Sequence, residues 1–167
     1  RLIKKINNIY FPNFSRPDKG MEFNRKIINY FSNNIKINFY AKGILFEDIK
    51  KYKNINVVRN NLNENEYLKK ILQFDIFILL YSENYFKYRT SGVLLDVLFH
   101  YKVCIVLEKT ELANFVEQYQ IGYVCKNSID DVLQKIDLLI NDSSFFFQNR
   151  AQLITKHKKK NNLQNLL

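Results

Sequence analysis

The sequence has little cysteine, proline, glycine or tryptophan, and several of these shortages exclude a class of protein. Two cysteines in 167 residues exclude a disulfide framework and a four-cysteine zinc site. Four glycines and two prolines exclude collagen-like and linker-type chains. The longest apolar run, residues 76–81, is as long as a strand and far shorter than the ~18–20 residues of a membrane span. Both thiols, Cys104 and Cys125, lie in apolar runs, so we expect them to be buried.

Positive charge is abundant, with 26 Lys and Arg against 16 Asp and Glu, a net charge of +10. Lysine, asparagine and isoleucine are abundant and are encoded by AT-rich codons, so part of this positive charge reflects the base composition of the genome. The 11 tyrosines and 14 phenylalanines fall on predicted core faces and the basic residues form no stripe, which argues against nucleic-acid binding. The chain begins at Arg1, without an initiator Met or signal region, and we expect it to be a piece of a longer polypeptide.

Strand-like and helix-like stretches alternate along the chain, which is typical of a parallel sheet between two layers of helices. Strands are predicted at residues 6–11, 35–40, 55–58, 75–81, 103–107 and 123–125. Helices are predicted at residues 21–31, 47–52, 63–72, 93–101, 111–119, 128–140 and 143–157. The fold class is therefore α/β, a Rossmann-like doubly wound parallel sheet of about six strands with helices on both faces. We expect one domain over residues 1–167, of which 156–167 form a basic tail.

Three local patterns refine this prediction. Residues 75–81 are apolar without alternation, which predicts a central strand covered on both faces. Asn63 and Ser128 are expected to cap the helices that follow them. The apolar residues of the helix after Asn63 predict its buried stripe, namely Tyr67, Leu68, Ile71 and Leu72.

The loop after the first strand, residues 15–20, combines two cations with the start of a helix. Arg16 supplies a two-pronged guanidinium, Lys19 a point charge, and the helix end contributes free N–H groups. The loop therefore predicts an anion site. The alternative is a solvated turn in which Pro17 and Gly20 only change the chain direction.

A second loop, residues 88–92, follows the most apolar strand and opens an apolar helix. Thr90 or Ser91 can cap that helix, and Gly92 lets a phosphate approach the backbone closely. Asp96 lies one turn further along, where its carboxylate can accept hydrogen bonds from both hydroxyls of a ribose. The alternative is a capped core helix with an incidental Asp on its solvated side.

The carboxyl ends of parallel strands meet at one edge of a sheet, so we expect both loops to converge on one crevice. Arg16, Lys19, Arg89 and a helix N-terminus would together supply enough positive charge for a diphosphate. The sequence identifies no structural role for Lys19 or Arg89 in these loops unless they bind an anion. Residues 59–62 could flank a base. A P-loop, a glycine triplet and a nucleophile elbow are absent from the sequence, and the two histidines are too far apart to suggest a metal site.

Residues 11–20 and 75–98 resemble the carboxyl-terminal domain of GT-B retaining glycosyltransferases, those with the "glycosyl transferases group 1" domain. Residues 101–106 stand where that family has a turn and strand, and residues 117–122 where it has a helix and glycine. The resemblance covers roughly residues 6–140. It implies a donor-binding domain for a sugar nucleotide.

By this resemblance, Arg16 and Lys19 would face the diphosphate and carry the catalytic stabilisation of the leaving group. The backbone amides of Ser91, Gly92 and Val93 would receive the distal phosphate. No metal and no cofactor are expected, because Arg and Lys would supply the positive charge.

Asp96 occupies the second acidic position of the family's paired-acid motif, where a carboxylate usually binds the ribose. The first acidic position is Tyr88 here, and Glu83 is near enough in the loop to contact the sugar instead.

The resemblance implies transfer of a sugar from a nucleotide sugar to a glycan or lipid-linked acceptor, in bacterial surface polysaccharide synthesis. An amino-terminal domain that is missing here would bind the acceptor, so we expect the fragment alone to be inactive. The location expected is the cytoplasm, with peripheral contact to the inner face of the membrane through the basic surface. The alternative is a non-catalytic nucleotide-binding module that completes its site with a partner chain.

Overall fold

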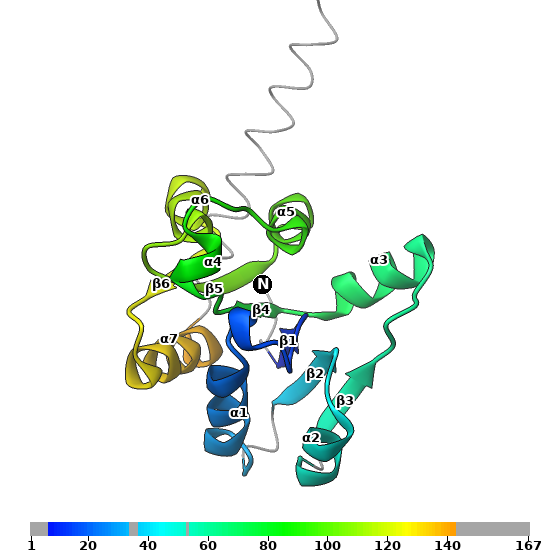
Figure 1. Ribbon diagram of the computed structural model, residues 1–167. Coiled ribbons are helices and arrows are strands. Elements are labelled where there is room, and N and C mark those ends of the chain that lie inside the picture. The colour runs from blue at the N-terminus through cyan, green and yellow to red at the C-terminus, as the bar shows by residue number, and fades with distance from the viewer. Residues whose placement is uncertain (1–6, 34–36, 53, 143–167) are drawn as a thin grey trace, which may run out of the picture.

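The computed structural model describes residues 7–33, 37–52 and 54–142, and the predicted helix 143–157 and basic tail 156–167 lie outside them. Six strands form one parallel sheet in the order β3-β2-β1-β4-β5-β6 (Figure 1). This strand order is that of Rossmann-type folds and confirms the predicted α/β class. The strands are β1 (Asn8–Phe11), β2 (Asn38–Lys42), β3 (Ile55–Val58), β4 (Ile76–Leu79), β5 (Val103–Leu107) and β6 (Gly122–Cys125).

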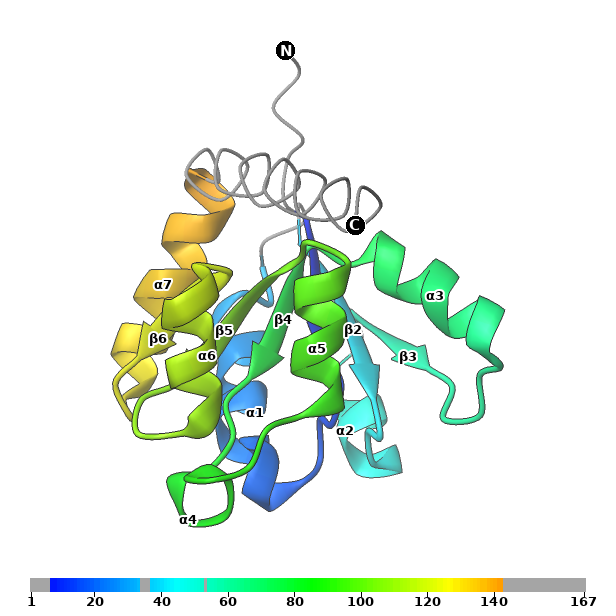
Figure 2. The same cartoon turned by 90° about the horizontal axis from the view of Figure 1, so that it is seen from above.

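Helices cover both faces of the sheet (Figures 1 and 2). One face carries α1, α2 and α7, and the other carries α3, α5 and α6. The helices are η1 (Pro17–Lys19, a 3-10 turn), α1 (Met21–Tyr30), α2 (Phe46–Lys51), α3 (Glu64–Gln73), α4 (Glu83–Phe86), α5 (Gly92–Phe99), α6 (Glu111–Tyr119) and α7 (Ile129–Asn141). Among the described residues, no helix is long and apolar enough to cross a membrane.

The central strand β4 divides its side chains between two hydrophobic clusters. Ile76 and Ile78 pack in the cluster under α1 and α7, whereas Phe77 and Leu79 pack in the cluster under α3, α5 and α6. All four side chains are buried, which confirms the prediction of a strand covered on both faces. An apolar strand without alternation is stable here because neither face of the sheet meets water.

Strand β2 lies further along the chain than predicted. It runs from Asn38 to Lys42 rather than over residues 35–40. The predicted alternation has the correct phase, because Ile37, Phe39 and Ala41 are all buried. The strand ends at Lys42, directly before Gly43, which the sequence predicts as the residue that ends it.

Helix N-termini follow the sequence only in part. Asn63 and Glu66 form the reciprocal capping box of α3, with both bonds at 3.0 Å. Ser91 and Ser128 occupy N-cap positions, but neither side chain accepts a capping hydrogen bond. The predicted position of the cap is confirmed for Ser128 and, of the alternatives Thr90 and Ser91, falls on Ser91, whereas the side-chain hydrogen bond expected of such caps does not form.

Two further predictions are corrected by the packing. Leu68 and Leu72 of α3 are 40% and 52% exposed, and only Ile71 of the predicted stripe is buried. Glu83 begins the short helix α4 instead of lying in an irregular loop.

The strand order reverses between β1 and β4, so the loops that leave these two strands flank the crevice where ligands of such sheets bind. The two loops touch, since the Ser82 amide donates to the Asp18 carbonyl at 2.9 Å. The fold therefore holds residues 15–20 against the segment that leads through α4 to residues 88–92.

Candidate functional site

A hollow of about 710 Å³ lies between the loop after β1 and the segment that carries α4. We call it the β1–β4 hollow, and its lining includes Arg16, Asp18, Lys19, Tyr85, Phe86 and Arg89. All three cations predicted to converge are among these residues. Their only carboxylate neighbour in the lining is Asp18, so positive charge dominates the hollow.

Arg16 is already engaged in a two-pronged ion pair. Its Nε atom donates to Asp18 Oδ1 at 3.0 Å, and Nη2 donates to Asp18 Oδ2 at 2.6 Å. The Arg16 side chain is 57% exposed, so water screens this pair and its net contribution to stability is small. A diphosphate can therefore compete with Asp18 for the guanidinium at little cost.

Lys19 lies against aromatic rings. Its Nζ atom is 4.9 Å from the ring centroid of Tyr81 and 5.8 Å from that of Phe86. Partial burial lowers the pKa of Lys19 from 10.5, Arg16 lowers it further, and Asp18 acts in the opposite direction. The ring contacts give Lys19 a structural task, so the expectation that it has none is wrong.

Arg89 is exposed on the rim of the same hollow. Its side chain forms no hydrogen bond or ion pair with any residue that the structure describes. The guanidinium is therefore available to an anion without the loss of an internal contact.

Tyr81 connects the two loops beneath the cations. Its hydroxyl accepts a hydrogen bond from Asn13 Nδ2 at 3.3 Å. Burial raises the pKa of Tyr81, and the Ser91 and Asn13 side chains oppose the rise. The sequence placed Tyr81 only at the end of a buried strand. The sequence could have indicated this role, because Tyr81 ends an apolar run and a buried tyrosine hydroxyl needs a hydrogen-bond partner.

Ser91, Gly92 and Val93 do not line the β1–β4 hollow. Ser91 is buried at the N-cap of α5. Gly92 begins α5, and a methyl group added there would meet no heavy atom within 4 Å. Gly20 is different, since its φ is +85° and a Cβ would lie 2.5 Å from the Leu80 carbonyl oxygen. Packing thus explains glycine at position 20 but not at position 92.

Asp96 lies between α3 and α5 rather than on a purely solvated face. The Tyr67 hydroxyl donates to Asp96 Oδ2 at 2.5 Å, and both side chains are half-buried. Burial and this hydrogen bond raise the pKa of Tyr67. The Lys42 ammonium lies 5.8 Å from the centroid of the Tyr67 ring. Among the described residues, none donates to Asp96 Oδ1, which leaves that oxygen for a ligand.

The structure separates two other predicted groups from the cations. Glu83 lines a neighbouring hollow of about 350 Å³, together with Gly20, Leu80 and Glu108. Three of residues 59–62, namely Arg59, Asn61 and Leu62, border a third hollow, of about 440 Å³, beside α3. In the part of the chain that the structure describes, no cluster of His, Cys, Asp or Glu could hold a metal ion.

Comparison with known proteins finds likeness in structure only. No protein-family model matches the sequence, and no curated protein matches it. The carboxyl-terminal domain of LpcC, a glycosyl transferase group 1 family protein from Francisella tularensis, superposes with a TM-score of 0.65 over 90% of this chain and 85% of that domain, at 17% identity. The chain has the fold of a GT-B carboxyl-terminal domain.

Two longer chains match this GT-B-type domain over only part of their length. WaaG, a glycosyltransferase involved in lipopolysaccharide biosynthesis, has a TM-score of 0.67 and 11% identity over 90% of this chain. The match spans 42% of the WaaG chain. A structure described as "Trehalose-6-phosphate from E. coli bound with UDP-2-fluoro glucose" has a TM-score of 0.63 and 11% identity, over 93% of this chain and 41% of that one.

Proposed function

We propose that this GT-B-type domain binds a nucleotide sugar and is the donor-binding half of a glycosyltransferase. The observation that carries the proposal is the convergence of Arg16, Lys19 and Arg89 on one hollow at the switch point of the sheet. That point is where open α/β sheets bind ligands. The solved structures of the same fold, WaaG and the LpcC domain, are glycosyltransferases, which supports the proposal.

The three cations would act on the leaving group. During transfer, the bond between the sugar carbon and the diphosphate oxygen breaks, and an acceptor hydroxyl forms the new bond and releases its proton. Negative charge grows on the diphosphate, where Arg16, Lys19 and Arg89 would stabilise it. Donors already aimed at developing charge are often the largest single contribution to catalysis. They would supply the positive charge that a metal supplies elsewhere, so the proposal includes no metal and no cofactor.

The rest of the donor would lie along the carboxyl edge toward α5 and α3. The amides of Ser91, Gly92 and Val93 would bind the distal phosphate, because a helix N-terminus favours anions and the space beside Gly92 is open. Asp96 Oδ1 would accept a ribose hydroxyl while Tyr67 engages Oδ2. Glu83 would contact the sugar if the sugar extends from the phosphates into the neighbouring hollow that Glu83 lines.

The finer proposal concerns the acceptor and the location. We propose a glycan or lipid-linked acceptor of bacterial surface polysaccharide, bound by a separate amino-terminal domain. The involvement of WaaG in lipopolysaccharide biosynthesis supports this class. Nucleotide sugars are made in the cytosol, so the proposed location is the cytoplasm, with peripheral contact to the inner membrane face through the net charge of +10.

A thermal-shift comparison of nucleosides with nucleoside diphosphates tests the donor site. A diphosphate at 100 times its dissociation constant should stabilise the chain by about 2.7 kcal/mol. Gly92→Ala should leave the melting temperature of the free chain unchanged, because the added methyl meets nothing, and should weaken diphosphate binding. Asp96→Asn should weaken the binding of nucleosides and of nucleoside diphosphates alike, because Asp96 would contact the ribose and not the phosphates. Absence of a shift with every nucleoside diphosphate would contradict the proposal.

One observation favours the alternative of a non-catalytic nucleotide-binding module. Tyr88 replaces the first acidic residue of the paired-acid motif, and its side chain is 85% exposed. Addition of purified candidate partner chains distinguishes the two proposals, since only the module would gain its function from a separate chain.

A further inference from the structure

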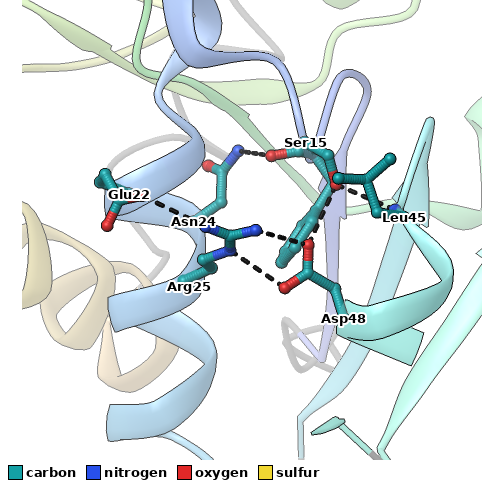
Figure 3. Close-up of polar contacts among 7 residues, drawn as sticks. Ser15, Glu22, Asn24, Arg25, Leu45 and Asp48 are labelled. Atoms are coloured by element: carbon teal, nitrogen blue, oxygen red, sulfur yellow. Dashed lines mark hydrogen bonds and ion pairs between the residues drawn. The ribbon is translucent and has the colours of Figure 1, made fainter. Parts of the chain in front are cut away.

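An ion pair between the half-buried Arg25 and the buried Asp48 joins α1 to α2 beside the loop after β1 (Figure 3). Arg25 Nε donates to Asp48 Oδ1 at 3.0 Å, and Arg25 Nη2 donates to Asp48 Oδ2, also at 3.0 Å. Asp48 is buried, and its hydrogen bonds are the main cause that raises the pKa of Arg25. Bidentate pairs of this kind fix the geometry of both partners.

Ser15 connects this ion pair to the loop (Figure 3). Its hydroxyl donates to Asp48 Oδ2 at 3.2 Å and accepts from the Leu45 amide at 3.0 Å. Leu45 is the N-cap of α2, so the hydroxyl also satisfies a backbone group at that helix end. Ser15 directly precedes Arg16 in the chain.

The segment before Arg16 is fixed from other sides as well. The Phe14 amide donates to the Lys42 carbonyl at 2.9 Å, and Asn24 Nδ2 donates to the Phe14 carbonyl at 3.0 Å. The Arg16 carbonyl then accepts the amides of Lys19 at 3.0 Å and Met21 at 3.3 Å. The backbone turn that presents both cations therefore begins at a point held by α1, α2 and the end of β2.

We infer that Asp48 and Arg25 are positioning residues for the β1–β4 hollow and act through Ser15 on Arg16 and Lys19. The inference rests on the proposed function. Neither residue lines the hollow. A pair with one buried partner is weak evidence for stability, and the better-attested use of such pairs is to specify one conformation. Cations fixed in advance need no reorganisation when the diphosphate arrives.

Ser15→Ala tests this inference because it removes the link and leaves the Arg25–Asp48 pair in place. The readout is the affinity for a nucleoside diphosphate divided by that for the matching nucleoside, both measured by calorimetry on the 167-residue chain. We expect this ratio to fall about 2- to 30-fold, the range for residues that act through others. An unchanged ratio overturns the inference.

Asp48→Asn and Asp75→Asn form a matched pair. Asp75 accepts the Asn7 and Asn8 amides at 3.1 and 3.0 Å, at the opposite edge of the sheet from the hollow. Asp48→Asn should lower the affinity ratio at least as much as Ser15→Ala. Asp75→Asn should leave it within about twofold, as expected of distant sites. Equal effects of the two substitutions would show a general structural role and overturn the inference.

Hydrogen exchange without ligand separates this inference from the proposed function. In Ser15→Ala, the amides of Lys19 and Met21, which bond to the Arg16 carbonyl, should exchange faster, while those of α7 keep their rates. If the unsubstituted chain binds no nucleotide but these amides exchange faster, the proposed function fails and the positioning of the turn stands. Unchanged exchange at Lys19 and Met21 overturns the inference.

Discussion

Arg89 and Lys19 line the same hollow in different surroundings, and this difference predicts different consequences of their removal. Arg89→Ala should weaken nucleoside diphosphate binding by about 1.5–3 kcal/mol, the range for hydrogen bonds to charged groups, without changing the melting temperature. Lys19→Ala should weaken binding similarly and also lower stability, because its ammonium contacts the Tyr81 and Phe86 rings. Calorimetry and thermal denaturation measure the two effects. A large loss of stability in Arg89→Ala with unchanged affinity would make Arg89 a structural residue.

The lowered pKa of Lys19 predicts a pH dependence of binding. Burial favours the neutral amine, so free Lys19 loses its proton at a pH below 10.5, and a bound diphosphate opposes this loss. Affinity should therefore fall as pH rises through the lowered pKa of Lys19. The free energy of unfolding of the free chain should instead rise as pH rises from the lowered pKa of Lys19 toward 10.5. In this pH range the native state binds fewer protons than the unfolded state.

Calorimetry between neutral pH and about pH 10 measures how the affinity for a nucleoside diphosphate changes with pH. The upper limit lies just below the ordinary lysine pKa. Lys19→Arg is the control, because arginine keeps its charge throughout that range and should remove the decline. A decline of equal size in Lys19→Arg would assign the titration to another group.

At the scale of the element, α3 and α7 provide a contrast between two N-cap residues. Asn63→Ala removes the side chain that accepts the Glu66 amide, so it should lower the free energy of unfolding by about 0.5–2 kcal/mol. Ser128→Ala should change it by less than about 0.5 kcal/mol, because Ser128 accepts no capping hydrogen bond. Urea denaturation of both variants measures the difference. Equal losses would contradict the assignment of the caps.

The sequence predicted the elements that local pattern determines. The burial of β4 follows from four apolar residues in a row, and Arg16, Lys19 and Arg89 converge because parallel strands end at one edge. The bond between Tyr67 and Asp96 could not be predicted, since it joins residues 29 apart and depends on how α3 packs beside α5. Ser128 occupies the N-cap position that the sequence predicts, and only the structure shows that its side chain accepts no capping hydrogen bond.

At the scale of the whole molecule, the length of the chain predicts a separation of binding from transfer. The chain spans 42% of WaaG and 85% of the LpcC carboxyl-terminal domain. We expect the 167-residue chain to bind a nucleoside diphosphate and to transfer no sugar, because the proposed acceptor site lies in another domain. Product analysis with labelled nucleotide sugars measures transfer. Robust transfer by this chain alone would contradict the two-domain proposal.

The pairing of β1 with β4 has a consequence for how the protein folds. The loops after these strands meet in the Asn13–Tyr81 hydrogen bond, which joins residues 68 apart. Contacts between segments so distant in sequence form slowly, because a long loop must close first. The segments β1–β3 and β4–β6 can each begin to pair earlier, but Lys19 comes from the first and Arg89 from the second. Nucleotide binding should therefore appear only in the last phase of refolding, and a bound ligand would fasten the two halves together.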